Sequence, residues 1–594
     1  MTDELSGPRL VANASSATET RLSEAIAATR SRPDDATAWD RLGLAFIAAR
    51  QTQAAPRCFA RAAELEPQNA LYAARLGKLL LALRQYDEAQ AALRRACTLA
   101  PESTQCLWLL GYALREQNDI DGALAAYARG CQIDPDNLHC AVAESLLLPP
   151  VYRNADDVLR WRARFESGLD RLQAELPRRR RWNGQVLALE WENFSLAYQG
   201  GDDRNLQERY SEFVAALLAR AVPALQAPMA RQSVRDRRIR VGFLSAELRI
   251  CTIGDYFASW ILDLPRDRFE VWCYFTGYLP DALTARIAAG CDRFRSLDGP
   301  VDALADVVRG DPPDVLIFPD VGMTSQSTLF ANLRLAPVQC AAWGHPVTTG
   351  SRHIEYFFSC GLMEPADAAA HYSEKLILLP ELGVRYEQPP RPETRSRSHF
   401  GFPQDAHIYV CPNRLHKILP AHDALFLDIV VEDPQAVLIF FDAVAPGQRR
   451  AFVDRLQRGM TARRIPPRQQ IRFLPTLPRA EFRSALAVSD VMLDTPNFSG
   501  GSSALDALAV GLPIVVREGR FMRGRQSAAM LRIIGVPELV VDDDRTYVEL
   551  ALRIATDRGY RSSLANRIAA GLPRLFARDE PIAALAEAVA KVVS

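Results

Sequence analysis

A period of 34 residues runs through the first part of the chain and restricts how that part can fold. Proline recurs at this interval, as Pro33, Pro67, Pro101 and Pro135. Glycine and alanine keep the same interval, at Gly43, Gly77, Gly111 and at Ala55, Ala89, Ala123. A unit of this length is a helix hairpin that cannot bury its own apolar face. At least three such hairpins must therefore stack into a right-handed solenoid with a concave groove.

The first unit carries Trp39, Leu42, Gly43 and Phe46, which match the W-x2-L-G-x2-Y pattern of a tetratricopeptide repeat. We expect three repeats over residues 36–138, preceded by a flexible N-terminus and a first helix over residues 1–35. The groove of such an array binds extended peptides or other proteins. A spacer or a dimerisation module is the alternative, so homodimer formation stays open.

Length and charge restrict the class of protein. A chain of 594 residues is too long for one core and should divide into about three or four domains. Lys plus Arg and Asp plus Glu are equal at 71 each, so no global field favours nucleic acid or an anionic membrane. No apolar stretch approaches about 18 residues and the N-terminus lacks a signal-like pattern, which predicts a cytoplasmic protein without a membrane partner. The 11 cysteines form no CxxC or Cys/His cluster, which indicates reduced thiols and no metal site.

Beyond the repeats the pattern changes from helical to alternating. Residues 139–235 lose the period but stay rich in Leu, Ala, Glu and Arg, which predicts a helical connector. From residue 239, short β-rich runs alternate with helical stretches, as in parallel sheets covered by helices on both faces. We predict two doubly wound Rossmann-like domains, at residues 236–390 and 391–594. The predicted strands are 239–245, 271–275, 315–318 and 338–343 in the first domain, and 408–411, 437–441, 471–473, 491–493, 514–516 and 539–541 in the second.

The segment 493–513, LDTPNFSGGSSALDALAVGLP, has the composition of an anion-binding loop. A buried strand ends at Leu493, and the SGGSS turn would let backbone N–H groups converge on an anion at a helix N-terminus. Asp506 lies one turn into that helix, within reach of a ribose whose phosphates sit at the helix start. The segment matches neither a P-loop nor G-x-G-x-x-G, and an ordinary strand, loop and helix is an equal alternative.

Six collinear segments resemble the O-GlcNAc transferase and SPINDLY-like glycosyltransferases, whose bacterial members join tetratricopeptide repeats to a two-domain GT-B region. The segments are RVGFLSAE (240–247), LAPVQCAAWGHPVTTGS (335–351), HYSEKL (371–376), CPNRLHK (411–417), LDTPNFSGGSSALDAL (493–508) and GRFMRGRQS (519–527). The resemblance implies an all-α tetratricopeptide solenoid followed by an α/β GT-B region of two facing Rossmann-like domains. The GHPVTTGS element is also similar to the related bacterial protein N-glucosyltransferases.

This resemblance implies an enzyme that moves a sugar, GlcNAc, from a UDP-sugar to a Ser or Thr side chain of a protein. The transfer would be inverting and independent of metal, with no cofactor besides the UDP-sugar donor, and the acceptor would bind through the repeat groove. Two alternatives stay open. One is a UDP-glucose-dependent protein N-glycosyltransferase, and the other is a degenerate repeat scaffold that binds nucleotide-sugar without turnover.

The resemblance places the donor in the second domain. Lys417 matches a lysine that contacts the donor diphosphate, where it would neutralise charge growing on departing UDP. Ser502 and Ser503, after Gly501, match small polar residues that hold the β-phosphate. Asp506 matches an acid that accepts hydrogen bonds from the ribose hydroxyls.

Two further donor-binding residues complete this set. Arg414 occupies a position that is glutamine in many relatives. Leu477, in the LPTLPRAE segment, matches a position that meets uracil through its backbone.

The acceptor side is predicted from loops of the first domain. Asp320 follows the predicted strand 315–318, where a carboxylate could accept a proton from an incoming hydroxyl. His345 lies in a sharp loop after strand 338–343 and could orient the sugar or the acceptor, although a structural role is the alternative. Thr348 and Thr349 would add polar contacts near the cleft. The predicted catalytic residues are therefore Lys417, Asp320 and His345.

One position departs from the family pattern. Many relatives carry a histidine in the loop after the first strand, where this chain has Cys251. A cysteine cannot do the work of an imidazole at neutral pH without a depressed pKa. Either the proton passes elsewhere, for example through Asp320, or activity is reduced or altered. Two other acidic positions are interpreted as structural: Glu374 in a domain-linking element, and residues 542–544 as a helix cap rather than a metal motif.

Overall fold

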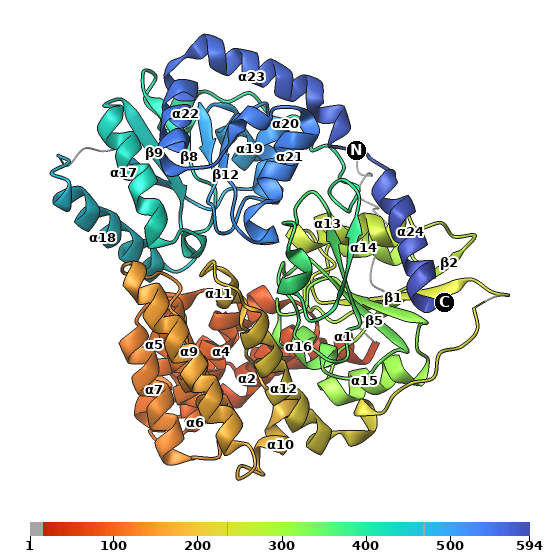
Figure 1. Ribbon diagram of the computed structural model, residues 1–594. Helices are drawn as coiled ribbons and strands as arrows, with labels where there is room; N and C mark the ends of the chain where they lie inside the picture. The colour runs from red at the N-terminus through yellow and green to blue at the C-terminus, as the bar shows by residue number, and fades with distance from the viewer. Residues whose placement is uncertain (1–15, 235, 467–469) are drawn as a thin grey trace, which may run out of the picture.

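The computed structural model describes residues 16–234, 236–466 and 470–594. It consists of a helical array, a helical connector and two α/β domains (Figure 1). In that view the array and connector lie at the lower left, the first α/β domain at the lower right and the second at the top. This arrangement confirms the predicted fold class, a repeat solenoid followed by two doubly wound domains.

The repeats are three helix hairpins with a preceding helix. The hairpins are α2 (Ala36–Ala48) with α3 (Ala55–Leu65), α4 (Ala70–Ala82) with α5 (Tyr86–Leu99), and α6 (Thr104–Glu116) with α7 (Ile120–Ile133), after α1 (Ser16–Ser31). Each first helix begins after a side-chain cap that follows a recurrent proline, at Asp35, Asn69 and Ser103. The glycines recur because the paired helices nearly touch: a Cβ on Gly43 would lie 2.7 Å from the Phe59 ring.

The connector continues the helical layer and then enters the space between the α/β domains. Its elements are α8 (Leu138–Leu146), α9 (Ala155–Glu175), α10 (Trp182–Gln185), η2 (Val186–Ala188), α11 (Phe194–Ala197), α12 (Arg204–Ala221) and η3 (Pro223–Gln226). The predicted helical character of residues 139–235 agrees with these elements. Trp182 and Phe213 are fully buried between them, with ring centroids 6.1 Å apart.

The first α/β domain contains a parallel sheet of seven strands in the order β3-β2-β1-β4-β5-β6-β7. The strands are β1 (Ile239–Ser245), β2 (Phe269–Phe275), β3 (Arg293–Ser296), β4 (Val315–Phe318), β5 (Val338–Ala342), β6 (Tyr356–Cys360) and β7 (Lys375–Leu379). The helices are α13 (Thr252–Leu262), α14 (Ala282–Gly290), α15 (Val301–Gly310) and α16 (Ser325–Ala331). The sequence prediction missed β3, β6 and β7. Two of these are edge strands, and β3 reads RFRS and is only half-buried, so neither an apolar run nor a clear alternation identifies it.

The second α/β domain contains a parallel sheet of six strands in the order β10-β9-β8-β11-β12-β13. The strands are β8 (His407–Val410), β9 (Ala436–Phe441), β10 (Ile471–Leu474), β11 (Val491–Leu493), β12 (Ile514–Arg517) and β13 (Val540–Val541). All correspond to predicted strands. The helices are α17 (Asp423–Glu432), α18 (Pro446–Ala462), α19 (Arg479–Ala487), α20 (Ser502–Ala509), α21 (Gln526–Ile534), α22 (Asp544–Thr556) and α23 (Arg558–Gly571). Asp543 caps α22 by accepting from the N–H of Thr546, which confirms the structural interpretation of residues 542–544.

The last helix, α24 (Glu580–Val593), returns to the first domain, where it packs against α13 and β7 (Figure 1). Glu587 pairs with Arg268 at 2.5 Å, and the guanidinium of Arg231 donates to the carbonyl of Val592 at 3.4 Å. The predicted domain 391–594 is therefore wrong at its end. An amphipathic helix carries no signal of which of two neighbouring sheets it will cover.

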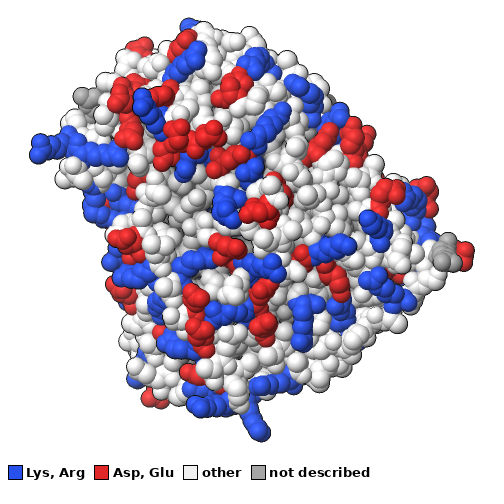
Figure 2. Space-filling model, in the orientation of Figure 1, with Lys and Arg blue, Asp and Glu red and all other residues white. Residues whose placement is uncertain are grey.

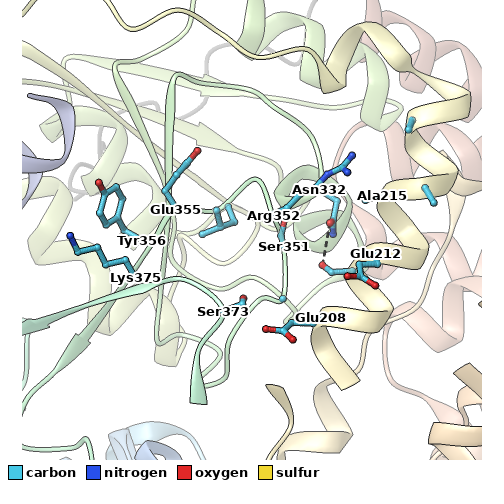
Figure 3. A pocket seen from close by; sticks show the side chains of 15 residues that line it. Glu208, Glu212, Ala215, Asn332, Ser351, Arg352, Glu355, Tyr356, Ser373 and Lys375 are labelled. Carbon is cyan, nitrogen blue, oxygen red and sulfur yellow. Dashed lines mark hydrogen bonds between the residues drawn. The ribbon is translucent and has the colours of Figure 1, made fainter. Parts of the chain in front are cut away.

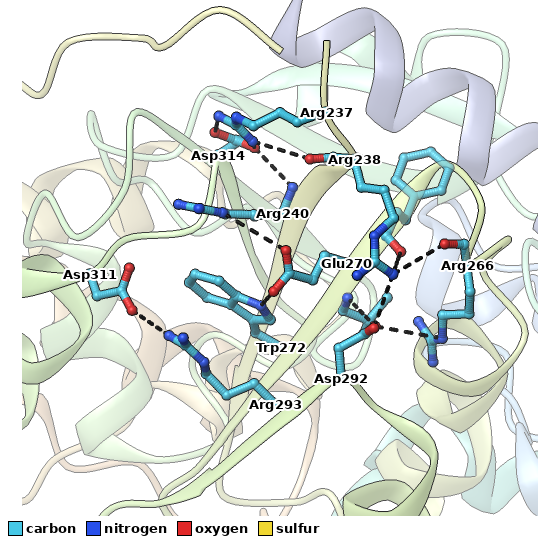
Figure 4. A network of polar contacts seen from close by, with 12 residues as sticks. Arg237, Arg238, Arg240, Arg266, Glu270, Trp272, Asp292, Arg293, Asp311 and Asp314 are labelled. Carbon is cyan, nitrogen blue, oxygen red and sulfur yellow. Dashed lines mark hydrogen bonds and ion pairs between the residues drawn. The ribbon is translucent and has the colours of Figure 1, made fainter. Parts of the chain in front are cut away.

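An Arg-rich network holds the segment that leads into β1 (Figure 4). Arg237 makes a two-pronged pair with Asp314, at 2.6 and 2.7 Å, and Arg238 pairs with Asp292 at 3.1 Å. Nearby, the guanidinium of Arg293 lies 4.1 Å from the centroid of a Trp272 ring. The charged residues precede or begin strands of the first sheet, away from the carboxyl ends, so the network anchors the domain and does not belong to the cleft.

Charged side chains of both signs interleave over the face shown in Figure 2, in keeping with the zero net charge. In the part of the chain that the structure describes, no helix has the length and apolar character needed to span a bilayer.

Candidate functional site

Each sheet has one point where its strand order reverses, and the chemistry-bearing residues gather there. In the first sheet this point lies between β1 and β4, and in the second between β8 and β11. Ligands of doubly wound domains bind in the crevice outside the carboxyl ends of the strands at such a point. Asp320 follows β4, and the predicted anion loop follows β11, so both predicted half-sites lie at these positions.

The anion loop is held by its own buried polar groups. The N–H of Gly500 donates to Asp494 Oδ1 at 2.7 Å, and Ser527 Oγ donates to the carbonyl of Gly500 at 2.9 Å. Asn413, just after β8, donates to Thr495 Oγ1 at 2.5 Å and so joins the ends of the two strands. Burial raises the pKa of Asp494 to about 6. This framework fixes the turn that leads into α20.

The N-terminus of α20 faces the first domain. Gly501 precedes the helix and supplies no side-chain cap. The hydroxyl of Tyr256, from α13, occupies the space where a Cβ on Gly501 would lie, which explains why this position lacks a side chain. Ser502 and Ser503 form the first turn and are half-buried. Their contact with a phosphate stays a prediction, and the helix end supplies the partial positive charge that it needs.

Lys417 lies beside this helix end. It closes the short helix η6 (Leu415–Lys417) after β8, and its Nζ is 4.2 Å from the centroid of the Phe498 ring. Burial and the neighbouring Arg414 lower the pKa of Lys417 to about 8, against the opposing effect of Asp494. The ammonium is therefore still charged at pH 7. Arg414 is exposed and, in the described ranges, makes no ion pair.

The Asp506 carboxylate is more buried than expected for a residue that binds a ribose. It lies 3.4 Å from both Arg479 Nε and Arg483 Nη1, on α19. Arg479 also pairs with Asp255 of the first domain at 2.6 Å, so this cluster joins the two domains across the cleft. A ribose could reach Asp506 only by sharing it with these guanidinium groups. Leu477 precedes α19 and is half-buried, and its contact with a base stays a prediction.

Asp320 is fully buried at the end of β4. Ser245, at the end of β1, donates to Asp320 Oδ2 at 2.9 Å, and Oδ1 has no hydrogen-bond partner in the described chain. Burial raises the pKa of this carboxyl to about 7, against the lowering effect of the Ser245 hydrogen bond. At neutral pH the group can therefore either hold or accept a proton.

His345 lies against the turn that follows Asp320. Its Nδ1 is 3.0 Å from the carbonyl of Val321, and because a carbonyl only accepts, Nδ1 carries the proton. Nε2 is then an unprotonated acceptor, and it is buried without a partner among the described residues. Burial lowers the pKa of His345 to about 4, so the ring stays neutral at pH 7. The structure thus places Asp320 and His345 at the same turn, and their acceptor-side roles stay predictions.

Thr348 and Thr349 form hydrogen bonds that stabilise the loop in which they lie. Thr348 Oγ1 donates to Glu374 Oε2 at 2.6 Å, the N–H of Thr349 donates to Oε1 at 2.8 Å, and the Thr349 hydroxyl also bonds to Glu374. Both hydroxyls are thus engaged by Glu374, and their contact with a substrate stays a prediction, whereas the structural interpretation of Glu374 is confirmed. Glu374 fixes the loop from behind and with it the position of His345.

A large cavity lies behind this loop. It has a volume of about 770 Å³ and opens between α12 and the strands β6 and β7 (Figure 3). Glu208 and Glu212 line it on one side and Lys375 on another. None of the predicted site residues lines it, so its size does not mark the site.

Two connector residues join the half-sites, and the sequence prediction missed them. The Phe194 ring lies 4.8 Å from the His345 ring and 6.5 Å from the Phe498 ring. The Tyr198 ring lies 5.0 Å from Phe498 and 4.7 Å from His416, the neighbour of Lys417. The rings of Phe194 and Phe498 thus link His345 to Lys417. No local pattern marks these residues, because the connector lacks the period that identifies the repeats.

No three His, Cys, Asp or Glu side chains in residues 16–234, 236–466 and 470–594 gather closely enough to hold a metal ion.

Comparison with known proteins identifies the family. The model of glycosyl transferase family 41 matches residues 222–384 and 383–573, more than half of the chain. The chain belongs to glycosyl transferase family 41. A tetratricopeptide repeat model matches residues 74–137, which confirms the repeats in that range.

Similar plant proteins match about half of this family 41 chain. The SEC protein of Arabidopsis thaliana, a probable UDP-N-acetylglucosamine–peptide N-acetylglucosaminyltransferase, is 26% identical over 353 residues, which are 56% of this chain and 35% of SEC. The SPINDLY protein of Eustoma exaltatum subsp. russellianum, with the same named activity, is 26% identical over 320 residues, 51% of this chain and 34% of that protein. The chain thus spans about a third of these relatives.

One solved structure resembles nearly the whole family 41 chain. A point variant of the O-GlcNAc transferase of Thermobaculum terrenum superposes with a TM-score of 0.68 over 98% of both chains at 24% identity. At that identity the likeness concerns the fold, including how the repeats join the two α/β domains.

The GRFMRGRQS segment of this family 41 protein holds the connector in place. Arg523 is buried, donates to the carbonyl of Ala197 at 2.8 Å and pairs with Asp203 at 3.1 Å. Asp203 is fully shielded and also pairs with Arg162 at 2.8 Å. Arg523 thus links the second domain to the stretch that carries Phe194 and Tyr198.

The protonation state of Cys251 does not suit a catalytic base. Cys251 occupies the N-cap position of α13 without a side-chain capping bond, and its thiol donates to the carbonyl of Glu247 at 3.4 Å. Burial raises the pKa of this thiol to about 12, so it stays protonated at neutral pH. This thiol is therefore unsuited to act as a general base at neutral pH.

Proposed function

We propose that this chain is an inverting glycosyltransferase that moves N-acetylglucosamine from its UDP derivative to a Ser or Thr hydroxyl of a protein, without a metal ion. The named activity of the plant relatives supports the donor and the peptide acceptor. Family membership supports sugar transfer as the reaction class.

Two chemically different half-sites lie on opposite sides of one aromatic cluster, and this arrangement is the main support for the proposal. On the second domain, Lys417 and the N-terminus of α20 present positive charge to a diphosphate. On the first, Asp320 and His345 present unpartnered acceptor atoms. A leaving group that gains charge and a hydroxyl that loses a proton need these two environments.

The acceptor oxygen attacks the anomeric carbon from the face opposite UDP, and the bond from that carbon to the β-phosphate oxygen breaks. The electron pair leaves with UDP, where Lys417 and the helix end stabilise the charge. The hydroxyl proton passes to the carboxylate of Asp320, whose pKa near 7 suits this exchange better than the low pKa of His345. His345 Nε2 accepts a hydrogen bond that orients the hydroxyl or the sugar.

Replacement of the lysine tests the assignment. Lys417→Ala should lower kcat for transfer from UDP-N-acetylglucosamine to a peptide pool at least about 100-fold, because departing charge loses its closest cation. Lys591→Ala, an exposed lysine on α24, is the matched control and should transfer normally. Mass spectrometry of the peptides measures transfer, and circular dichroism checks that both variants are folded.

Unchanged transfer by Lys417→Ala would sink the proposal. The same assay with UDP-glucose decides between oxygen and nitrogen acceptors, because the modified side chain is read directly from fragment masses. Binding of UDP without any transfer by the wild-type protein would favour the nucleotide-sugar-binding scaffold, an alternative that the protonated thiol of Cys251 motivates.

A further inference from the structure

The ring of Phe194 lies between the two proposed half-sites. Its centroid is 4.8 Å from that of His345 on the first domain and 6.5 Å from that of Phe498 on the second. Lys417 Nζ lies 4.2 Å from the centroid of the same Phe498 ring. During transfer the anomeric carbon lies between the leaving phosphate and the attacking hydroxyl. A sugar that is transferred between these half-sites must therefore lie next to Phe194.

Phe194 differs from the other rings of this cluster in its exposure. Tyr198, Phe498 and His345 are buried, whereas Phe194 is half-buried and keeps accessible surface. Its ring meets those of His345, Tyr198 and Phe498 at interplanar angles of 65°, 67° and 87°. None of these ring neighbours in the described chain lies parallel to it. The cluster thus holds an aromatic ring on which no other ring is stacked.

The stretch that carries Phe194 is fixed against the second domain. The carbonyl of Ala197, in the same short helix α11, accepts from Arg523 Nε at 2.8 Å. Gly200 passes so close to the anion loop that a Cβ on it would lie 2.8 Å from the carboxamide of Asn497. In Figure 1, α11 lies at the border between the connector and the second domain. The ring is therefore held in place before any ligand binds.

An accessible aromatic ring beside an unpartnered polar atom matches the surface of a sugar. A pyranose presents C–H groups on its faces and hydroxyl groups around its edge. Aromatic rings pack against apolar surface of this kind, and a few polar groups fix the orientation of the ligand. Here His345 Nε2 is such a group, since it is buried without a partner among the described residues.

We propose that Phe194 packs against the C–H face of the donor sugar and holds its anomeric carbon between Lys417 and Asp320. This inference rests on the proposed function, because it takes the sugar of that donor as the ligand. The connector is then part of the sugar site as well as a link between the repeats and the α/β domains.

The test compares two ligands that differ only in the transferred sugar. Phe194→Leu removes the flat ring and keeps an apolar side chain. By titration calorimetry it should weaken binding of UDP-N-acetylglucosamine about fivefold or more, because the aromatic contact is lost. Its affinity for UDP should equal that of the wild type, since UDP lacks the transferred sugar. Phe194→Tyr keeps the ring and should recover most of the affinity.

Phe400 offers a matched control. It is also half-buried, and its ring centroid lies 4.8 Å from that of a histidine, His399. It belongs to η5 (Arg397–Phe400), which precedes β8, whereas the proposed site lies beyond the carboxyl end of that strand. Phe400→Leu should therefore bind both ligands as the wild type does. In turnover, Phe194→Leu should raise the KM for UDP-N-acetylglucosamine and leave the KM for peptide unchanged.

Circular dichroism checks that each variant is folded, and Phe194→Met, which also lacks a ring, takes the place of Phe194→Leu if that protein does not fold. Three results would overturn the inference. The first is wild-type affinity of the ring-less variant for UDP-N-acetylglucosamine, including the case where only the KM for peptide rises. The second is an equal loss for UDP, and the third is an equal loss in Phe400→Leu. Failure of the wild-type protein to bind UDP-N-acetylglucosamine at all would instead remove the proposed function on which the inference rests.

Discussion

At the scale of single residues, burial sets the chemistry of the proposed acceptor side. Asp320 and His345 are in contact with one turn, yet burial moves their pKa values in opposite directions, to about 7 and about 4. Both groups can therefore be neutral at neutral pH, and each retains an unpartnered atom in the described structure. A proton acceptor thus exists without a histidine at position 251.

This arrangement predicts a pH dependence of transfer. Asp320 accepts a proton only when ionised, so kcat/KM should rise as pH increases through about 7. Asp320→Asn should lose this rise and lower kcat about 100-fold or more. Ser245→Ala removes the hydrogen bond that lowers the pKa of Asp320, so its rise should move to higher pH. A profile of Ser245→Ala that overlays the wild type, or one that moves to lower pH, would contradict the role of Asp320.

At the scale of elements, the repeat glycines illustrate tight helix pairing. Alanine in a helix is normally better than glycine by up to about 1 kcal/mol. At Gly43, however, the added Cβ would lie 2.7 Å from the Phe59 ring, tighter than packed carbon atoms allow. Steric strain should therefore exceed the gain in helix propensity.

Gly43→Ala should accordingly lower the free energy of unfolding by about 1–3 kcal/mol, as overpacking does. Gly310→Ala is the matched control, because nothing lies within 4 Å of a Cβ there. Urea denaturation followed by circular dichroism measures both. A Gly43→Ala protein as stable as Gly310→Ala would mean that α2 and α3 can separate without cost.

At the scale of the whole molecule, the connector determines how the two half-sites meet. Arg523, Asp203 and Arg162 form a buried ion cluster between the connector and the second domain. Burial raises the pKa of Asp203, and the two arginines oppose that effect. Removing one arginine would leave the buried carboxylate poorly compensated.

Arg523→Met should therefore lower the free energy of unfolding by about 3–5 kcal/mol, and it should reduce transfer because Phe194 and Tyr198 lose their anchor. Arg520→Met, in the same segment, removes an exposed pair with Asp367 and should change stability by less than about 1 kcal/mol. Thermal unfolding and the peptide assay measure the two effects. Equal behaviour of the two variants would exclude Arg523 as the link between connector and second domain.

Sequence patterns within short stretches of the chain made much of this fold predictable. The repeats follow from a fixed spacing, and the second sheet follows from apolar runs bounded by turns. The strand, turn and helix of the predicted anion loop are recognisable because Leu493 to Asp506 carry all three in one short stretch. By contrast, β3 and β7 lie at sheet edges with mixed polarity, and the aromatic residues Phe194 and Tyr198 have no local signature.

The sequence alone determined the repeat array, the class of both α/β domains and the position of the anion loop, because each depends on residues close together in the chain. Only the tertiary structure decided which side chains meet. It moved α24 onto the first domain, paired Asp506 with Arg479 and Arg483, and turned Thr348 and Thr349 toward Glu374. These outcomes depend on contacts between segments that are distant in the chain. Such contacts leave no pattern in the spacing or composition of neighbouring residues.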